Sequence, residues 1–357
     1  MKMITRKTIG KFCLVLGGKM QASTKTPHVP VMADETIKFL KPQNNELFLD
    51  MTFGAGGHTK EILKVAPSAK IIALDRDPTA YEMALELAKQ YPDQIFPVLG
   101  RFSDLPEQLS TMKVKQKSFD GIIFDFGCSS MQFDEGCRGF SISKDGPLDM
   151  RMDQNRLQDI PSAAEVLAKI DETDLAQVLK IYGEEKHAKK IARAIVDARY
   201  TNKKIETTKE LADVVQSCLG SGSFHLDKLQ RPSHPATKTF QALRIFVNNE
   251  LNEINYGMIL AQRYLKIGGK MIAITFHSLE DTIVKRHVMG NVLNDMANKL
   301  PLKYCSHSVS YEHDEMENAM KTPWYQMTKH VVLPSFDEVE RNPRSRSAKL
   351  RAVVRVA

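Results

Sequence analysis

The glycine-rich stretch 50–58, Asp-Met-Thr-Phe-Gly-Ala-Gly-Gly-His, constrains the fold of this chain more than any other segment. An apolar run at 47–49 leads into it, and a helical pattern follows it. Glycine has no Cβ and tolerates positive φ, so Gly54, Gly56 and Gly57 allow the backbone to approach a ligand closely. The pattern therefore predicts a strand, a tight turn and a helix N-terminus, the ligand-binding corner of a Rossmann-like α/β sheet.

The spacing of these glycines indicates which ligand the loop suits. A dinucleotide fingerprint requires a glycine at the position of Thr59, and a nucleoside-triphosphate loop requires a lysine followed by serine or threonine. The chain has neither feature in this loop. A Gly-x-Gly-Gly turn of this kind suits S-adenosylmethionine, whose methionine part lies over such a loop. A plain tight turn without a ligand is the alternative.

A carboxylate at the end of the next apolar run supports a ribose-containing ligand. The run 71–74 predicts a buried strand, and Asp75 ends it about twenty positions past the glycine turn, where a ribose-binding carboxylate is expected. Two ribose hydroxyls can donate to its two oxygens. Asp77 and Pro78 predict instead the N-cap and first turn of a helix over 79–90.

The composition narrows the class of protein. The chain has 357 residues, enough for two domains, and no apolar run approaches the roughly 20 residues needed to cross a bilayer. The net charge of +7 favours a polyanionic partner. The five cysteines lack CxxC spacing, which argues against a zinc site or a disulfide framework and favours a reducing compartment.

The N-terminal segment is basic and contains no acidic residue before Asp34. Hydroxyl residues and a short apolar patch are interspersed among its lysines and arginines. This composition predicts a mitochondrial presequence over residues 1–27. A basic tail that contacts nucleic acid is the alternative.

Four apolar runs predict the strands of one sheet. Helical patterns between the runs indicate parallel strands with helices on both faces. About eighty residues of helical pattern precede the last run, long enough for an inserted helical domain. The predicted strands are Leu47–Asp50, Lys70–Leu74, Phe119–Asp125 and Lys270–Phe276.

We therefore predict a methyltransferase-like sheet domain in two parts, residues 28–152 and 233–357, and an inserted substrate-recognition domain at 153–232. A repeat of apolar residues after Pro235 predicts one long helix that ends at Gly268-Gly269. Residues 291–320 lack a pattern and are predicted to form a polar loop.

Two basic segments admit two interpretations each. Lys186, Lys190 and Arg193 share one face of a predicted helix, which is either a solvated surface or a track for RNA phosphates. The run 341–351 suits either RNA phosphates or a local acidic patch.

The strand that ends at Asp125 carries the predicted chemistry. Ligands of open α/β sheets lie at the carboxyl ends of strands. Methyltransferases that act on an exocyclic amine place Asp or Asn followed by a short turn here. The cytosine amine is a poor nucleophile, so an acceptor that orients it and takes its proton is useful. Ser129 and Ser130 in the following turn are candidates for holding the base.

The charged stretch 131–153 follows this site directly, and loops so long are functional or disordered. We predict a lid or a substrate-recognition loop, with Arg138, Asp149 and Arg151 as substrate contacts. His277, at the end of the last strand, is a further candidate. A hydrolase is disfavoured, because adjacent His277 and Ser278 cannot form a triad unaided and GxSxG is missing. Ser278 is predicted to cap a helix instead, with Asp281.

A set of long motifs in one order resembles the MraW family of small-subunit ribosomal RNA cytosine-N4 methyltransferases. The resemblance spans roughly 28–290 and the C-terminal basic run. The motifs are His28–Met32, Thr52–His58, Leu74–Pro78, Phe126–Gln132, Arg138–Ser141, Lys144–Asp153, Tyr182–Lys186, His234–Ile245, Phe276–Asp281 and Asn342–Ser347. Phe126 and Cys128 stand where bacterial members usually carry Leu and Val, which are similar in size.

The resemblance implies a class I methyltransferase that uses S-adenosylmethionine to methylate N4 of one cytidine in the decoding region. Similarity is greatest to the animal mitochondrial branch, which implies small-subunit rRNA or the assembling subunit as partner, in the mitochondrial matrix. No metal is expected, because the sulfonium is already a good leaving group, and a homodimer is compatible with this interpretation. The cofactor residues that it implies are Gly56, Gly57, His58, Asp75, Phe102, Asp125 and Gln132.

The chemistry expected is in-line attack of the cytosine amine on the sulfonium methyl, with Asp125 in contact with both and Ser129 and Ser130 as further catalytic candidates. Two alternatives remain. The chain could be a ribosome-assembly factor whose binding matters more than its methylation. It could instead methylate a small molecule, although the basic run, the charged loop and the inserted domain exceed what that requires.

Overall fold

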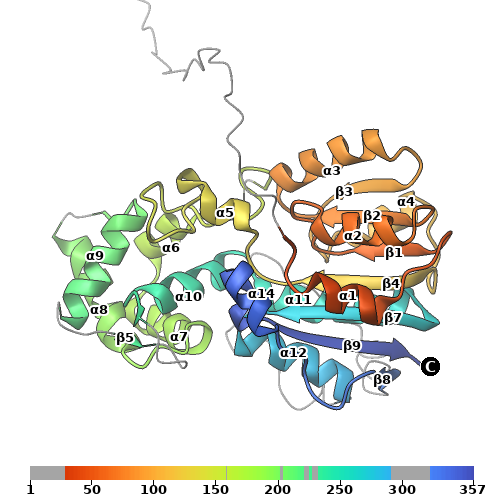
Figure 1. Ribbon diagram of the computed structural model, residues 1–357. Helices are drawn as coiled ribbons and strands as arrows, with labels where there is room; N and C mark the ends of the chain where they lie inside the picture. Colours follow the sequence, from red (N-terminus) through yellow and green to blue (C-terminus); the bar gives the residue numbers. More distant parts are fainter. Residues whose placement is uncertain (1–28, 158, 202–203, 221–224, 227–231, 291–321) are drawn as a thin grey trace, which may run out of the picture.

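The structure is a computed structural model that describes residues 29–157, 159–201, 204–220, 225–226, 232–290 and 322–357. The predicted presequence 1–27 and the predicted polar loop 291–320 lie outside the described residues. The described chain forms a sheet lobe and a helical lobe, joined by the stretch 131–157 and by helix α10 (Figure 1). None of the described helices is both long enough and apolar enough to span a membrane.

The sheet lobe contains seven strands in the order β3-β2-β1-β4-β7-β9-β8. Strands β3 to β7 of this order are parallel, and β9 runs antiparallel to both of its neighbours. The order reverses between β1 and β4, the switch point where ligands of such sheets bind. The bounds are β1 Leu47–Asp50, β2 Lys70–Asp75, β3 Ile95–Leu99, β4 Phe119–Asp125, β7 Leu265–Thr275, β8 Trp324–Gln326 and β9 Lys349–Arg355.

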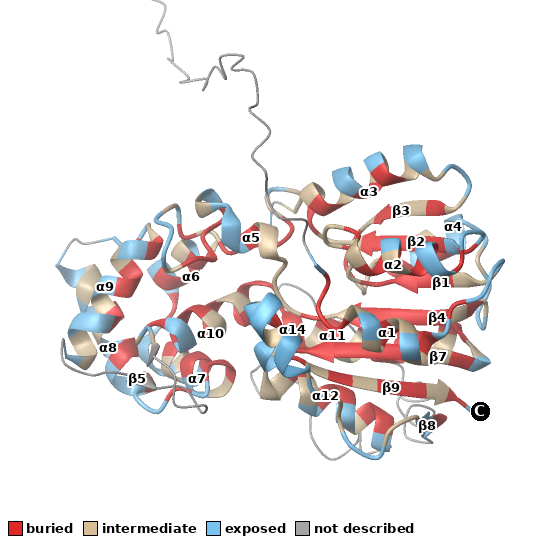
Figure 2. Cartoon of the chain, viewed as in Figure 1, coloured by how far each residue is buried: buried red, intermediate tan, exposed pale blue. Residues whose placement is uncertain are grey.

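Helices cover both faces of the sheet, as predicted. Alternate strand residues point to opposite faces, so Phe48 packs with Ile62 of α2, whereas its neighbour Leu49 belongs to the core that contains Leu109 of α4 and Met258 of α11. Figure 2 shows the buried strands between these layers. One face carries α1 (Ala33–Leu40), α2 (Gly57–Val65) and α3 (Pro78–Gln90), and the other carries α4 (Leu105–Thr111), α11 (Glu250–Tyr264) and α12 (Ser278–Met289).

The helical lobe contains α6 (Ala163–Lys169), α7 (Glu172–Tyr182), α8 (Ala188–Tyr200) and α9 (Thr208–Leu219), with a small antiparallel pair, β5 (His225–Leu226) and β6 (Pro232–Ser233). Helix α10 (Thr237–Val247) packs against α6 and α7. Packing of this lobe therefore extends past residue 232. The predicted domain boundaries themselves stay a prediction.

The single long helix predicted after Pro235 is wrong. Asn249, with φ 51, separates α10 from α11, and Gly268-Gly269 lies inside β7 rather than after a helix. An Asn tolerates this left-handed conformation, so the chain can change direction without losing its apolar repeat. The C-terminal basic run, which the sequence suggested to be a tail, instead ends inside the sheet, because its last residues form β9.

The stretch 131–153 is ordered, with a short helix α5 (Ser130–Asp134) and a 3₁₀ turn η1 (Gly136–Arg138). Its last residue, Asp153, is buried and forms ion pairs with Arg76 after β2, Arg101 after β3 and Arg156. Burial alone would raise the pKa of Asp153, but the guanidinium groups of Arg76 and Arg101 outweigh it and lower that pKa to about 2. One carboxylate thus fastens the stretch to two strand ends.

We expect Asp153→Asn to lower the free energy of unfolding by about 3 kcal/mol, because it leaves buried guanidinium groups without a countercharge. The pKa of Asp153 is lower in the folded chain than in the unfolded one. The pair therefore stabilises the fold above a pH of about 4 and loses this effect as the pH falls toward 2. Urea unfolding at several pH values tests both statements. The exposed Asp197 of α8, 3.8 Å from Arg193, supplies the control Asp197→Asn, with a change below about 0.5 kcal/mol. Equal losses in both variants would contradict the assignment.

Candidate active site

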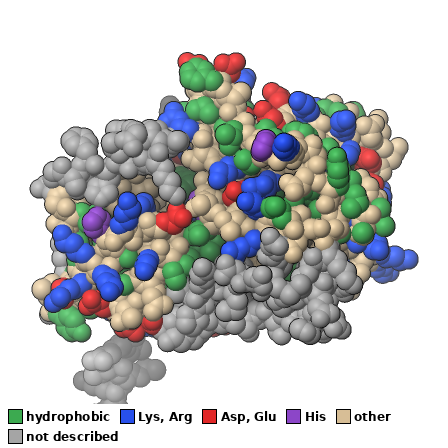
Figure 3. Space-filling view, turned by 90° about the horizontal axis from the view of Figure 1, so that it is seen from below, with side chains coloured by type: hydrophobic (Ala, Val, Ile, Leu, Met, Phe, Trp, Pro, Cys, Tyr) green, Lys and Arg blue, Asp and Glu red, His purple; other side chains and the backbone are tan. Residues whose placement is uncertain are grey.

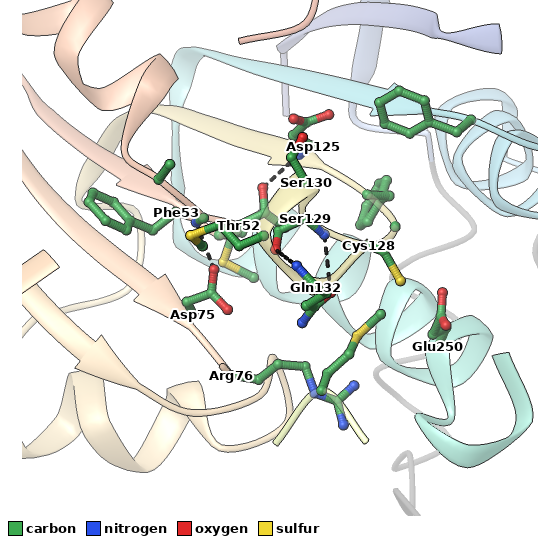
Figure 4. A pocket seen from close by; sticks show the side chains of 18 of the residues that line it. Thr52, Phe53, Asp75, Arg76, Asp125, Cys128, Ser129, Ser130, Gln132 and Glu250 are labelled. Carbon is green, nitrogen blue, oxygen red and sulfur yellow. Dashed lines mark hydrogen bonds between the residues drawn. The ribbon is translucent and has the colours of Figure 1, made fainter. Parts of the chain in front are cut away.

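A cavity of about 490 Å³ opens at the carboxyl ends of β1, β2 and β4, at the switch point of the sheet (Figure 4). Its volume is within the range of cofactor sites. Eight residues predicted to bind cofactor or to act in catalysis line it: Gly57, His58, Asp75, Phe102, Asp125, Ser129, Ser130 and Gln132. The cavity is also lined by Arg76, Cys128, Met152, Arg244, Glu250, Phe276 and Arg344, for which the sequence suggested no such place.

The glycine turn joins β1 to α2 and forms one wall of the cavity. Gly56 has φ 74 and does not line the cavity itself. A Cβ at Gly56 would lie 2.6 Å from the ring of Phe53, and a Cβ at Gly57 would lie 2.8 Å from Pro30. Gly56 therefore shapes the turn, whereas Gly57 faces the ligand space. The turn leaves backbone, rather than side chains, along this wall.

Asp75 ends β2 and holds the glycine turn in place. One carboxylate oxygen accepts a hydrogen bond from the Gly54 amide at 2.7 Å, and the other accepts one from the Asp77 amide at 2.9 Å. Burial raises the pKa of Asp75 to about 7. Each oxygen retains a second lone pair, so the carboxylate can still accept a hydroxyl from a ligand.

Asp77 caps α3 as predicted, accepting from the Thr79 amide at 2.9 Å. It does more than that. Its carboxylate also accepts from Gln132 Nε2 and from Arg138 Nη1, both at 2.8 Å. Gln132 forms a capping box with Ser129 at the start of α5. The turn that carries the two candidate serines is therefore anchored, through Gln132, to the helix after β2.

The four residues predicted to contact substrate do not line the cavity. Arg138 is buried and also donates to the carbonyls of residues 151 and 152, and Arg151 forms a two-pronged pair with Asp149 at 2.9 and 2.7 Å. His277 caps α12, in place of the predicted Ser278. These side chains bind other parts of the protein, so the geometry does not support the predicted substrate contacts.

Asp125 ends β4 and faces the cavity. Its backbone amide donates to Thr52 Oγ1 at 2.7 Å, which fixes the strand end against the glycine turn. Its Oδ1 is buried and has no hydrogen-bond partner within the described residues, and its Oδ2 lies 3.8 Å from His58 Nε2. Asp125 lines the cavity and its side chain is 24% exposed, so the carboxylate can accept a hydrogen bond from a ligand.

Aromatic side chains form the apolar part of the site. The ring of Phe102 lies edge-on to Phe124 and Phe126, with centroids 5.7 and 6.2 Å away. Gly257 of α11 lets the ring approach, because a Cβ there would lie 2.9 Å from it. Rings fixed in this way suit a flat heterocyclic ligand.

The side of the cavity opposite Asp75 contains a charged group that the sequence interpretation missed (Figure 4). Arg244 binds both carboxylate oxygens of Glu250 at 2.8 and 2.9 Å. Burial raises the pKa of the neighbouring Cys128 to about 12, so this thiol stays neutral. Arg244 lies in the motif 234–245, which the sequence analysis singled out without assigning a role, and that motif was the available signal.

Glu250, His277 and Glu280 have ligand atoms within 4.8 Å of one another, a spacing that could hold a metal ion. The chemistry of the set disfavours one. Arg244 already engages Glu250 and lies 3.8 Å from Glu280, so a cation would have to compete with a guanidinium. The expectation of a metal-free site stays a prediction.

Two similar proteins are named as ribosomal RNA methyltransferases. The human (Homo sapiens) protein named 12S rRNA N(4)-cytidine methyltransferase METTL15 is 48% identical over 337 residues, which cover 92% of this chain and 83% of that protein. Ribosomal RNA small subunit methyltransferase H of Brucella anthropi is 42% identical over 330 residues, 92% of this chain and 87% of that protein.

A third similar protein is much longer. A Culex quinquefasciatus protein named receptor-type tyrosine-protein phosphatase mosPTP-1 is 75% identical over 340 residues, 95% of this chain, but the chain spans only 23% of its length. The family model described as the MraW methylase family matches residues 25–356. With this match over nearly its whole length, the chain belongs to the MraW methylase family.

Proposed function

We propose that this chain transfers a methyl group from S-adenosylmethionine to the exocyclic N4 amine of a cytidine in small-subunit ribosomal RNA. The observation that carries the proposal is the partly exposed carboxylate of Asp125, at the switch point beside a glycine turn and Asp75. The human and bacterial relatives are named for rRNA methylation, of 12S rRNA N4-cytidine and of the small subunit.

The residues present fit the cofactor. The backbone at Gly57 faces the space for its methionine part, Asp75 offers acceptors for ribose hydroxyls, and the ring of Phe102 offers an apolar wall for adenine. When bound, the cofactor supplies a methyl group activated by a sulfonium.

The protein supplies orientation, a proton acceptor and exclusion of water. The lone pair of a cytosine amine is delocalised into the ring, so the amine must be held in line and relieved of a proton as the N–C bond forms. The partly exposed carboxylate of Asp125 can accept that proton. Ser129 and Ser130 line the cavity beside it and are proposed to hold the base. A base enters such a cavity only when it is unstacked from its neighbours.

The helical lobe offers a surface for the rest of the RNA. Figure 3 shows Lys and Arg side chains gathered on the face of this lobe that is seen from below. Lys186, Lys189, Lys190 and Arg193, at and along the start of α8, are exposed. Phosphates supply much of the affinity of RNA-binding proteins, so this face is proposed to bind the strand that flanks the target base.

A 12S rRNA substrate places the protein in the mitochondrion, and we propose the matrix as its compartment. The basic segment 1–27 supports this location as a presequence. The homodimer with which the family resemblance is compatible stays a prediction.

The proposed reaction is tested by incubating purified chain with small-subunit rRNA and labelled cofactor, followed by mass spectrometry of the nucleosides. We expect N4-methylcytidine. Asp125→Asn and Asp125→Ala should lower the rate at least about 100-fold, because both remove the proton acceptor. The same change at the exposed Asp213, as Asp213→Asn, should leave the rate unchanged.

Normal turnover after Asp125→Ala would refute the role of Asp125. An Asp125→Asn variant that makes no methylcytidine but still restores assembly of the small subunit would favour the assembly-factor alternative. Transfer to a small molecule but to no form of the rRNA would refute the proposed substrate.

Cofactor affinity should depend on pH through Asp75. Ribose hydroxyls donate best to the ionised carboxylate, whose pKa before binding is about 7. Binding of the unreactive product S-adenosylhomocysteine, measured by calorimetry, should therefore weaken by up to about tenfold between pH 8 and pH 6. Asp75→Asn should bind more weakly at pH 8 and lose this dependence. An affinity of the wild-type chain that does not change with pH would contradict the ribose assignment.

The basic face makes a separate prediction. Replacing Lys186, Lys190 and Arg193 together by Gln should weaken binding of single-stranded rRNA fragments whatever their sequence. The slope of log affinity against log salt should fall by about 2, near 0.7 for each lost phosphate contact. Lys64 and Lys89 pair with glutamates on the sheet lobe and supply the control double substitution to Gln. An unchanged salt slope in the triple variant would show that the face is only a solvated surface.

A further inference from the structure

The entrance of the cavity lies between two segments that are distant in the sequence. Phe133 of α5 and Arg344 of the 3₁₀ turn η3 (Pro343–Ser347) both line the cavity. Both also face solvent, Phe133 with 36% of the residue exposed and Arg344 with 49% of its side chain exposed. Figure 1 shows α5 and α14 (Phe336–Arg341), the helix before η3, where the two lobes meet. These two side chains therefore border the path by which a ligand enters.

The turn that carries Arg344 is fixed beside the cavity. Ser345 is fully buried, and its Oγ donates to the carbonyl of Asn342 at 2.8 Å. The side chain of Asn342 donates in turn to the carbonyl of Val29 at 3.2 Å, and the next residue, Pro30, lines the cavity. The backbone of η3 is thus held in place, whereas the guanidinium of Arg344 reaches away from it toward α5.

Arg344 meets α5 in an ion pair that water can reach. Its Nη2 donates to Asp134 Oδ1 at 3.0 Å, and the side chain of Asp134 is 43% exposed. Lys144 Nζ lies 3.7 Å from the same oxygen and donates to the carbonyl of Asp134 at 2.6 Å. Two cations therefore share one carboxylate, so the group carries one positive charge in excess.

This group can accept a phosphate. An exposed ion pair is weak, because water screens it and two long side chains must be held in one geometry. Arg344 engages Asp134 through one nitrogen, and its other N–H groups have no partner within the described residues. A guanidinium binds a phosphate through two parallel hydrogen bonds. A phosphate at the entrance would therefore gain donors and the excess charge that Asp134 leaves unused.

The ring of Phe133 suits the entrance to a nucleotide rather than to a phosphate alone. It packs edge-on with the ring of Phe140, with centroids 6.4 Å apart, so its position is supported from the protein side. When a base is unstacked, the base next to it in the strand loses a stacking partner. An exposed aromatic ring beside the cavity can replace that partner, whatever the identity of the base.

We propose that the entrance between α5 and η3 is a subsite for the nucleotide that adjoins the target cytidine. Arg344 and Lys144 bind its phosphate, and Phe133 stacks on its base. In the free protein Asp134 occupies the two cations. This inference rests on the proposed function and deepens it, because it names the residues that hold the RNA at the point where the target base leaves the strand.

Two substitutions that break the same ion pair should change RNA binding in opposite directions. The full chain is titrated into labelled single-stranded fragments of small-subunit rRNA, and fluorescence anisotropy is measured at several salt concentrations. Arg344→Gln should weaken binding about five- to tenfold and lower the slope of log affinity against log salt by about 0.7, because one phosphate contact is lost. Asp134→Asn releases both cations and should tighten binding.

The matched controls break an exposed ion pair of α3 with the same changes of net charge. Glu86→Gln and Lys89→Gln should each alter the affinity by less than about twofold, because salt screens charges far from the strand. An ion pair that only supports the fold predicts weaker binding in both Asp134→Asn and Arg344→Gln. That result, or no change in either variant, would overturn the proposal.

The ring is tested by Phe133→Leu. This variant should weaken binding about fivefold and leave the salt slope unchanged, because stacking does not depend on the charge of the phosphate. Tyr325→Leu, an exposed ring of β8 at the edge of the sheet, is the control and should have no effect. An unchanged affinity in Phe133→Leu would overturn the nucleotide subsite.

A change in the RNA itself locates the phosphate. In a fragment that the chain methylates, the linkage on each side of the target cytidine is replaced, one at a time, by an uncharged methylphosphonate. At one linkage the replacement should weaken binding to the wild-type chain about five- to tenfold and affect Arg344→Gln far less, because that contact is already lost. Equal losses in both proteins at both linkages would overturn the assignment to the adjoining nucleotide.

The outcomes separate this inference from the proposed function. Opposite effects of Arg344→Gln and Asp134→Asn on binding, without transfer to any form of the rRNA, would support the subsite and refute the proposed reaction. Formation of N4-methylcytidine by a chain whose RNA affinity responds to none of the three substitutions would refute the subsite and leave the reaction intact.

Discussion

The buried carboxylate of Asp153 is the contact on which the shape of this active site depends. It faces Arg76 and Arg101, which follow two neighbouring strands of the sheet, and also Arg156. A buried charge without its partner costs several kcal/mol, so these groups can be accommodated only together. The stretch that follows β4 must therefore return to the ends of β2 and β3.

A second buried carboxylate, Asp77, acts in the same way. Asp77 holds Gln132 and Arg138, which both follow the turn after Asp125. The stretch 131–153 is thus tied down near its start and at its end. The charged composition of this stretch would suit a moving lid, but these ties hold the stretch in one place beside the cavity. Nearly all of its charged side chains pair with other groups of the protein.

Elements and residues that depend on a local sequence pattern could be predicted. Those that depend on partners distant in the sequence were missed. Strands β1 and β4, the glycine turn and the positions of Asp75 and Asp125 follow from short runs that repeat the same signal. Strand β3 was missed because Pro97 interrupts its pattern, which an edge strand tolerates. Strand β9 was missed because its basic residues suggested a tail, although Arg351 pairs with Asp281.

In the candidate site, too, the errors concern residues whose partners are distant in the sequence. Arg138 was predicted to bind substrate because a charged loop residue beside a site usually faces it. The sequence does not show that Asp77, sixty-one positions earlier, takes that charge. Arg244 was missed for the opposite reason. A basic residue in an apolar helix suggests a solvated side chain, and the sequence does not show that Glu250 lies beside it.

The pairing of the other charges explains why the carboxylate of Asp125 is left for chemistry. Arg244 is neutralised by Glu250, Arg76 by Asp153, and the Asp75 carboxylate is held by two amides. Oδ1 of Asp125 has no such partner within the described residues. If the other charged side chains of the cavity were also unpaired, the site would bind many cations and anions without orienting any of them. Because the surrounding charges are paired, a proton donor that enters the cavity finds its acceptor at the end of β4, where the amine of a base must lie to be methylated.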